Sequence, residues 1–147
     1  MIDRLTEHFG TALELPPDAV QWLLDLWRVT QMLDDVVDND PIDREELNST
    51  IFLALVGLPA NPFFQAHRIN LLPVLATSVL KWQASNFVEQ NGSADEKSFV
   101  WRSAYYDVVL MVVMLCHGVE KATNAAPYVM KMYGEVFADY VKEFPHA

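Results

Sequence analysis

The chain has 147 residues, 52% of them hydrophobic and 12% aromatic, which is enough apolar material for a core without disulfides. Its net charge of -10 would repel a phosphate backbone, so direct binding of DNA or RNA is not expected. The lone cysteine excludes an intrachain disulfide and a thiolate metal cluster, and no stretch has the pattern of a signal peptide or a membrane span. We therefore expect one domain over residues 1–147.

Glycine and proline bound the first two predicted helices. We predict a short helix from Ile2 to Phe9, stopped at Gly10, and a long one from Pro17 to Asn39. On the helical wheel of the long helix, Asp34 and Asp38 fall in the arc that should face the interior. The opposite side is mostly polar and should face water; it consists of Gln21, Asp25, Arg28, Met32 and Asp35.

Asp43 and Glu46 have the spacing of a capping box, which predicts the start of a third helix. Apolar residues then recur at spacings of four, four and three, and this stripe should face the core. Its members are Leu47, Ile51, Leu55 and Leu58.

Asn61-Pro62 predicts the start of a long helical segment that runs to Gln90. Pro73 lies inside this segment. Because proline lacks an amide donor and its ring crowds the preceding turn, we expect a kink or a break near Asn70.

The last third of the chain predicts a buried helix followed by an amphipathic one. A capping box from Ser93 to Glu96 should open a helix that ends at Gly118, and its apolar run predicts a central position in the fold at about 94–117. Pro127 should open the final helix. No segment has a sustained period of two, so we predict an all-α bundle of about six helices.

The stretch from Asp34 to Glu46 carries the strongest charge signal. Seven of its thirteen residues are acidic, and only Arg44 opposes them. Carboxylates at i, i+1 and i+4 on one helix can hold a divalent cation, but they are equally compatible with a solvated helix end. The sequence leaves both interpretations open.

Asp107 is the second candidate, because it interrupts the most apolar predicted helix. A carboxylate there should be paired. A basic partner, drawn from Arg28, Arg68, Lys81 or Arg102, would make it structural. If it instead converges with Asp34 and Asp38, the three form an all-oxygen site whose expected metal is Mg²⁺.

Two short motifs resemble those of Mg²⁺-dependent all-α enzymes. Asp34-Asp35-Val36-Val37-Asp38 resembles the D-D-x-x-D motif of class I isoprenoid synthases, which binds Mg²⁺ and substrate diphosphate. Tyr106-Asp107-Val108-Val109-Leu110 is similar to the second acidic motif of all-α nucleoside triphosphate pyrophosphohydrolases, although Ala104 occupies the position of the companion acid. These resemblances imply a phosphohydrolase or a diphosphate-binding enzyme.

Most of the chain resembles short, functionally uncharacterised all-α proteins of tailed bacteriophages and prophages. The shared features are an aspartate-rich helix end at 34–40, Leu58-Pro59-Ala60-Asn61-Pro62-Phe63-Phe64, Leu80-Lys81-Trp82, and the stretch from Arg102 to Asp107. The resemblance implies a phage or prophage origin and the cytoplasm of a bacterial host cell.

Three classes of function follow. The favoured one is a non-enzymatic phage or prophage accessory protein that acts through protein–protein contacts. The first alternative is the Mg²⁺-dependent enzyme, with Asp34, Asp38 and Asp107 as ligands. The second is an acidic decoy that mimics nucleic acid. As partners we expect a second copy of the chain, in a dimer, and a host or phage protein, but no membrane.

Overall fold

The computed structural model describes residues 1–144, and every regular element in this range is helical. The predicted all-α class is therefore confirmed. The chain divides into two compact units, Met1–Arg68 and Ile69–Ala147. The expected single domain over residues 1–147 stays a prediction.

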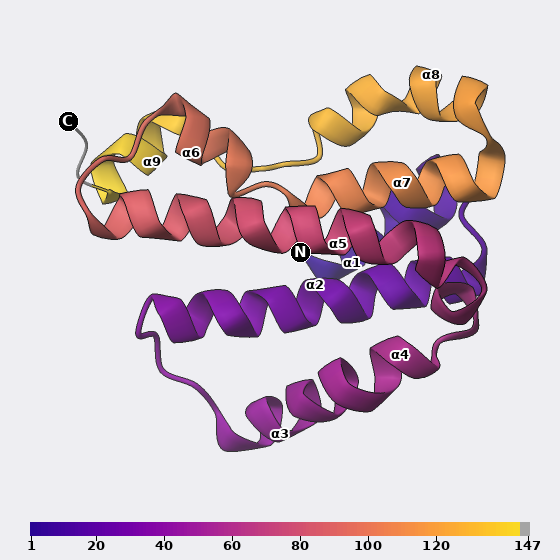
Figure 1. Cartoon of the computed structure of the whole chain (residues 1–147), viewed down its shortest axis with the longest axis horizontal. Helices are drawn as coiled ribbons and strands as arrows, with labels where there is room; N and C mark the ends of the chain where they lie inside the picture. The colour runs from indigo at the N-terminus through magenta and orange to yellow at the C-terminus, as the bar shows by residue number, and fades with distance from the viewer. Residues whose placement is uncertain (145–147) are drawn as a thin grey trace. The chain divides into compact units, whose positions relative to one another are not determined.

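The first unit begins with helix α1 (Ile2–Glu7), which continues into the π-helical turn η1 (His8–Ala12) (Figure 1). The prediction that this helix stops at Gly10 was wrong. In a π-turn the backbone bonds reach five residues back, and the amide of Leu13 donates to the carbonyl of His8 at 2.9 Å. The wider turn carries the chain past Gly10.

Helix α2 (Pro17–Val37) supplies much of the core of this unit. Its start at Pro17 was predicted, and its end lies two residues before the predicted Asn39. Asp25 and Met32, which were expected to face water, are instead buried. Gln21 donates to the Asp25 carboxylate at 2.8 Å, and Arg28 lies 3.7 Å from it. These two contacts supply the polar partners that a buried carboxylate requires.

A second arm of the first unit packs along α2 and consists of α3 (Arg44–Phe52), the π-helix η2 (Leu53–Gly57) and the short α4 (Leu58–Ala60) (Figure 1). Asp43 caps α3 by accepting from the amide of Glu46, as predicted. The predicted inward stripe was wrong, because Ile51 and Leu55 are 48% and 74% exposed. In α3 the buried position is Thr50 rather than Ile51. From Leu53 onward the π-helix changes the number of residues per turn, so a stripe read at a constant period of 3.6 does not stay on one face.

Helix α5 (Pro62–Gln90) begins as predicted. Asn61 accepts hydrogen bonds from the amides of Phe63 and Phe64 at 2.8 and 3.1 Å. The helix is not split at Pro73. The carbonyl that loses its partner belongs to Ile69, a residue 82% exposed, so water can solvate it.

In the second unit, the predicted helix at about 94–117 is two helices, α6 (Glu96–Trp101) and α7 (Tyr105–His117). Its cap is also shifted: Asp95 and Ser98 form the capping box, rather than the expected Ser93 and Glu96. The apolar character of α7 does produce burial, as predicted. The buried positions are Val108, Val109, Val112 and Val113.

Helix α7 pairs with α8 (Val119–Met130) in a helical hairpin, and α6 packs against α9 (Phe137–Glu143) (Figure 1). The hairpin turns at Gly118, whose φ of 89° favours glycine. The prediction that Pro127 opens the final helix was wrong, because Pro127 lies within the last turn of α8. The final predicted helix is thus divided between α8 and α9.

Candidate functional site

The acidic stretch from Asp34 to Glu46 spans the end of α2, a loop and the start of α3. Asp34 is half-buried and Asp38 is exposed. The prediction that both face the interior was therefore wrong for Asp38, which lies just beyond the end of α2. The amide of Asp38 donates to the carbonyl of Asp34 at 2.9 Å, and the next residue, Asn39, takes a left-handed conformation with φ 58°. The chain therefore leaves the helix between these two acids and Asp40, which is exposed.

Asp107 lies in the first turn of α7 and forms an ion pair with Lys81 of α5, with Nζ 2.7 Å from Oδ2. The Asp107 side chain is 46% exposed, so this residue is at the surface although the rest of α7 is apolar. Of the two alternatives for Asp107, pairing with a basic residue is the one observed. A pair this exposed contributes little to stability, typically below about 1 kcal/mol.

Within each unit, the described residues contain no group of three or more His, Cys, Asp and Glu side chains that could hold a metal ion. Asp34 and Asp38 belong to the first unit and Asp107 to the second. Their convergence on a Mg²⁺ ion, with or without a diphosphate, stays a prediction.

The second unit contains a buried polar network that the sequence did not predict. Its centre is Glu89 near the end of α5, a residue only 7% exposed. Its Oε2 accepts from the guanidinium of Arg102 at 3.2 Å and from the hydroxyl of Tyr140 at 2.9 Å. The Tyr140 hydroxyl also lies 2.6 Å from the hydroxyl of Ser98. Three helices, α5, α6 and α9, meet through these contacts.

Arg102 extends the network toward the segment before α9. Its Nε lies 3.3 Å from the carboxylate of Glu135, which also accepts a hydrogen bond from Tyr133. Its guanidinium carbon lies 5.3 and 5.1 Å from the ring centroids of Tyr140 and Phe144. A cation held between two rings and two carboxylates fixes both segments around it.

Burial sets the protonation of the two tyrosines. Burial is the main reason that the pKa of Tyr140 rises to about 12. The hydrogen bond to Ser98 lowers this pKa, and the hydrogen bond to Glu89 raises it further. Burial, followed by the hydrogen bond to Glu135, raises the pKa of Tyr133 well above its usual range. Both phenols therefore stay neutral donors at physiological pH, which suits the network to holding helices together.

An open pocket of about 310 Å³ lies beside this network. Asp95 and Ser98 line it, but their side chains already form the capping box of α6. Ser85 also lines it and donates to the carbonyl of Trp82 at 2.8 Å. These three polar side chains thus stabilise local structure.

The sequence carries one regular spacing that runs through the network, but its residue types hide it. Leu71, Ser78, Ser85 and Glu89 follow one another at spacings of seven, seven and four, which places them on one face of α5, and all four are buried. A face that combines serines and a glutamate with leucine does not look like a core face in the sequence. Glu89 was missed for this reason.

Comparisons of the chain with protein-family models, curated proteins and solved structures found no match. No single helix in residues 1–144 is long and apolar enough to cross a membrane, although the bent pair of segments Arg44–Ala60 and Pro62–Gln90 meets the length and composition criteria when taken together.

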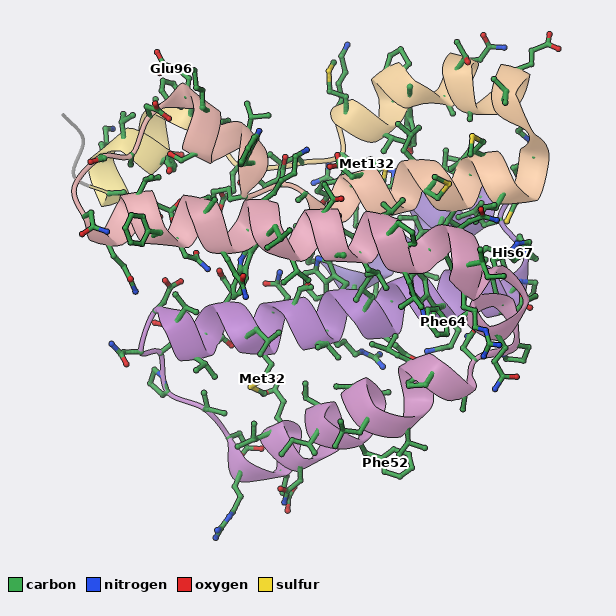
Figure 2. All side chains as sticks on the ribbon, viewed as in Figure 1. Met32, Phe52, Phe64, His67, Glu96 and Met132 are labelled. Carbon is green, nitrogen blue, oxygen red and sulfur yellow. The ribbon has the colours of Figure 1, made fainter. Side chains whose placement is uncertain are left out.

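Four large apolar side chains are exposed next to one another on α3 and η2, and we call them the outer patch. The exposed fractions are 48% for Ile51, 62% for Phe52, 74% for Leu55 and 45% for Val56. The Phe52 side chain points away from the ribbon of α2 (Figure 2). These four residues are the exposed large hydrophobic residues of the second arm of the first unit.

Proposed function

We propose that the chain is a non-enzymatic phage or prophage accessory protein that binds another protein through the outer patch. The observation that carries this proposal is the exposure of four neighbouring large apolar side chains on a single helical arm. An isolated exposed leucine needs no explanation, but a contiguous apolar patch commonly marks an interaction site.

The size of the outer patch supports the proposal. If the full surface of a large apolar residue is roughly 200 Å², the four side chains expose on the order of 450 Å². That is within the range of about 300–600 Å² for the largest patch on a monomer, which is often functional. Phe52 and Leu55, the most exposed of the four, are the expected anchors, because few residues carry most of the energy of an interface.

The charge around the outer patch indicates the chemistry of the partner. Glu45 and Glu46 are exposed in the first turn of α3, and Asp40 is exposed in the preceding loop; Arg44 is the one exposed base among them. Interfaces commonly combine an apolar centre with a polar rim. The partner should therefore present an apolar groove bordered by lysine or arginine, and the acidic rim would speed association at low ionic strength.

A pull-down from bacterial host lysate tests the proposal. Immobilised wild-type chain should retain a partner in stoichiometric amount, and Leu55→Glu should lose it. Val119→Glu is the matched control, because Val119 is 69% exposed but lies on α8 in the other unit. Circular dichroism establishes that each variant is folded. If Leu55→Glu and the wild type retain the same proteins, the outer patch does not carry the function.

The exposure of the acidic stretch favours a second candidate, a decoy for a nucleic-acid-binding protein. Asp38, Asp40, Asp43, Glu45 and Glu46 are all exposed, which a phosphate mimic requires. In that case Glu45→Gln/Glu46→Gln should abolish partner capture, whereas Leu55→Glu should leave it intact. The decoy requires both results. The outer-patch proposal requires that Leu55→Glu loses the partner.

A further inference from the structure

Helix α5 exposes a second apolar surface, in the other unit of the chain. We call it the α5 stripe. Its large side chains are 82%, 52%, 48%, 65% and 66% exposed at Ile69, Leu72, Val79, Leu80 and Phe87, respectively. Ala76 and Gln83, both exposed, complete it.

The buried face of α5 is unusually polar, and one exposed arc of the helix is unusually apolar. The buried face carries Ser78, Ser85 and Glu89 beside Leu71. Ser78 donates to the carbonyl of Ala104, Ser85 donates to the carbonyl of Trp82 within α5, and Glu89 accepts from Tyr140. The exposed face carries isoleucine, leucine, valine and phenylalanine. A helix that is soluble by itself normally has the opposite arrangement, so the α5 stripe is expected to be covered.

The positions of the α5 stripe fit a helix–helix contact. Ile69, Leu72, Ala76, Val79 and Gln83 are separated by three, four, three and four residues, the spacing of a coiled-coil seam. All seven members of the stripe fall within an arc of about 100° on the helical wheel. At 1.5 Å per residue, the stripe runs about 27 Å along the helix, and no member is charged.

We propose that the α5 stripe binds the α5 stripe of a second copy of the chain, with the two helices antiparallel and the two-fold axis between Val79 and Leu80. This contact lies in the other unit from the outer patch, so it goes beyond the proposed function and does not depend on it.

The size of the α5 stripe is suited to a dimer. At roughly 200 Å² for the full surface of a large apolar residue, the five large side chains expose on the order of 600 Å². A standard interface buries about 800 Å² per partner. The stripe therefore supplies most of the area that a specific dimer needs.

The antiparallel arrangement follows from side-chain size and charge. With the axis between Val79 and Leu80, each Val79 faces Leu80 of the other copy, and each Leu72 faces Phe87. Ala76 then faces Gln83, so a small side chain lies opposite a long one. A parallel pairing would place Phe87 against Phe87 and Gln83 against Gln83, and it would align the two helix dipoles unfavourably.

Sedimentation velocity at chain concentrations in the tens of micromolar tests the dimer. The wild type should sediment with twice the mass of one chain. Leu80→Glu should be a monomer, because its charge would be buried against Val79, and its dimer Kd should rise by about 100-fold or more. Val119→Glu, on an exposed site of the same unit, should remain a dimer. Circular dichroism should show equal helicity in all three proteins.

Single cysteines in a Cys116→Ala background test the orientation. Near the two-fold axis, Val79→Cys should form an intermolecular disulfide under mild oxidation. Ile69→Cys should not, because the two copies of residue 69 lie at opposite ends of an antiparallel pair, far beyond disulfide reach. Efficient cross-linking of both variants would show a parallel pair and overturn the proposed geometry. A monomeric wild type with no cross-linking at either position would overturn the dimer itself.

Discussion

The guanidinium of Arg102 lies 3.2 Å from the carboxylate of Glu89, and the two side chains are only 11% and 5% exposed. This ion pair connects the end of α5 to the turn between α6 and α7. Arg102 also bonds to Glu135 and stacks on Tyr140 and Phe144, so it is the central cation of the second unit.

Removal of this cation should destabilise the fold strongly. Arg102→Met leaves a buried carboxylate without its main partner, which typically costs about 3–5 kcal/mol and would lower the Tm by roughly 10 °C at this chain length. Arg44→Met is the control, because Arg44 is exposed and its replacement should change stability by no more than about 0.5 kcal/mol. Urea unfolding followed by circular dichroism measures both. Equal urea midpoints for Arg102→Met and the wild type would contradict a structural role for the network.

The network also predicts instability at high pH. The pKa of Tyr140 is about 12 in the folded protein, above the usual value of 10.0, so the folded state holds this proton more tightly than the unfolded state does. Stability should be independent of this group below pH 10 and should fall as the pH rises from 10 toward 12. Tyr140→Phe should show a shallower loss over the same range. Urea midpoints at a series of alkaline pH values test this, and parallel curves for the two proteins would refute it.

Residues that act locally made much of the fold predictable. Pro17, the cap at Asp43 and the Asn61-Pro62 start were correctly predicted because each one influences only the helix turn beside it. The break between α6 and α7 was missed. Arg102 lies there and its partner Glu89 is thirteen residues away, so a pattern limited to one helix could not reveal the contact.

The candidate sites also differ in whether a local sequence pattern marks them. The acidic stretch was visible in the sequence, and its position at a helix end was correctly predicted. The outer patch was not predicted, because Ile51 and Leu55 were assigned to the core on a constant period of 3.6. In α3 the buried residue is Thr50 rather than Ile51, and the π-helix interrupts the period before Leu55. The bond between Glu89 and Tyr140 spans 51 residues, which no local pattern can indicate.

Gly118 should be intolerant of any side chain. Its φ of 89° and ψ of 173° lie in a region that other residues rarely adopt, yet no atom lies within 4 Å of an added Cβ. Gly118→Ala should therefore cost about 1–3 kcal/mol through the backbone alone. Gly134→Ala is the matched control, because it also has open space and its φ is not positive; its stability should stay within about 1 kcal/mol of the wild type. A thermal melt that ranks them in the reverse order would contradict this explanation.

The acidic stretch should respond to substitution as a crowded helix end. Asp34→Asn/Asp38→Asn should raise stability slightly, by about 0.3–1 kcal/mol for each acid, because carboxylates oppose the dipole at the C-terminal end of α2. Mg²⁺ or Mn²⁺ should leave the Tm of both proteins unchanged. A metal site saturated at about 100 times its Kd would add about 2.7 kcal/mol to the wild type. Such a shift, absent from the double variant, would favour the enzyme alternative.

The central claim is that the outer patch binds a protein. Site-specific photo-cross-linking in host cells tests this claim most directly. A photoreactive residue in place of Leu55 should give a discrete adduct of constant mass after irradiation. The same residue in place of Val119, which is similarly exposed on the other unit, should not. An adduct at Leu55 alone supports the proposed function. The absence of an adduct at Leu55, or the same adduct at both positions, would contradict it.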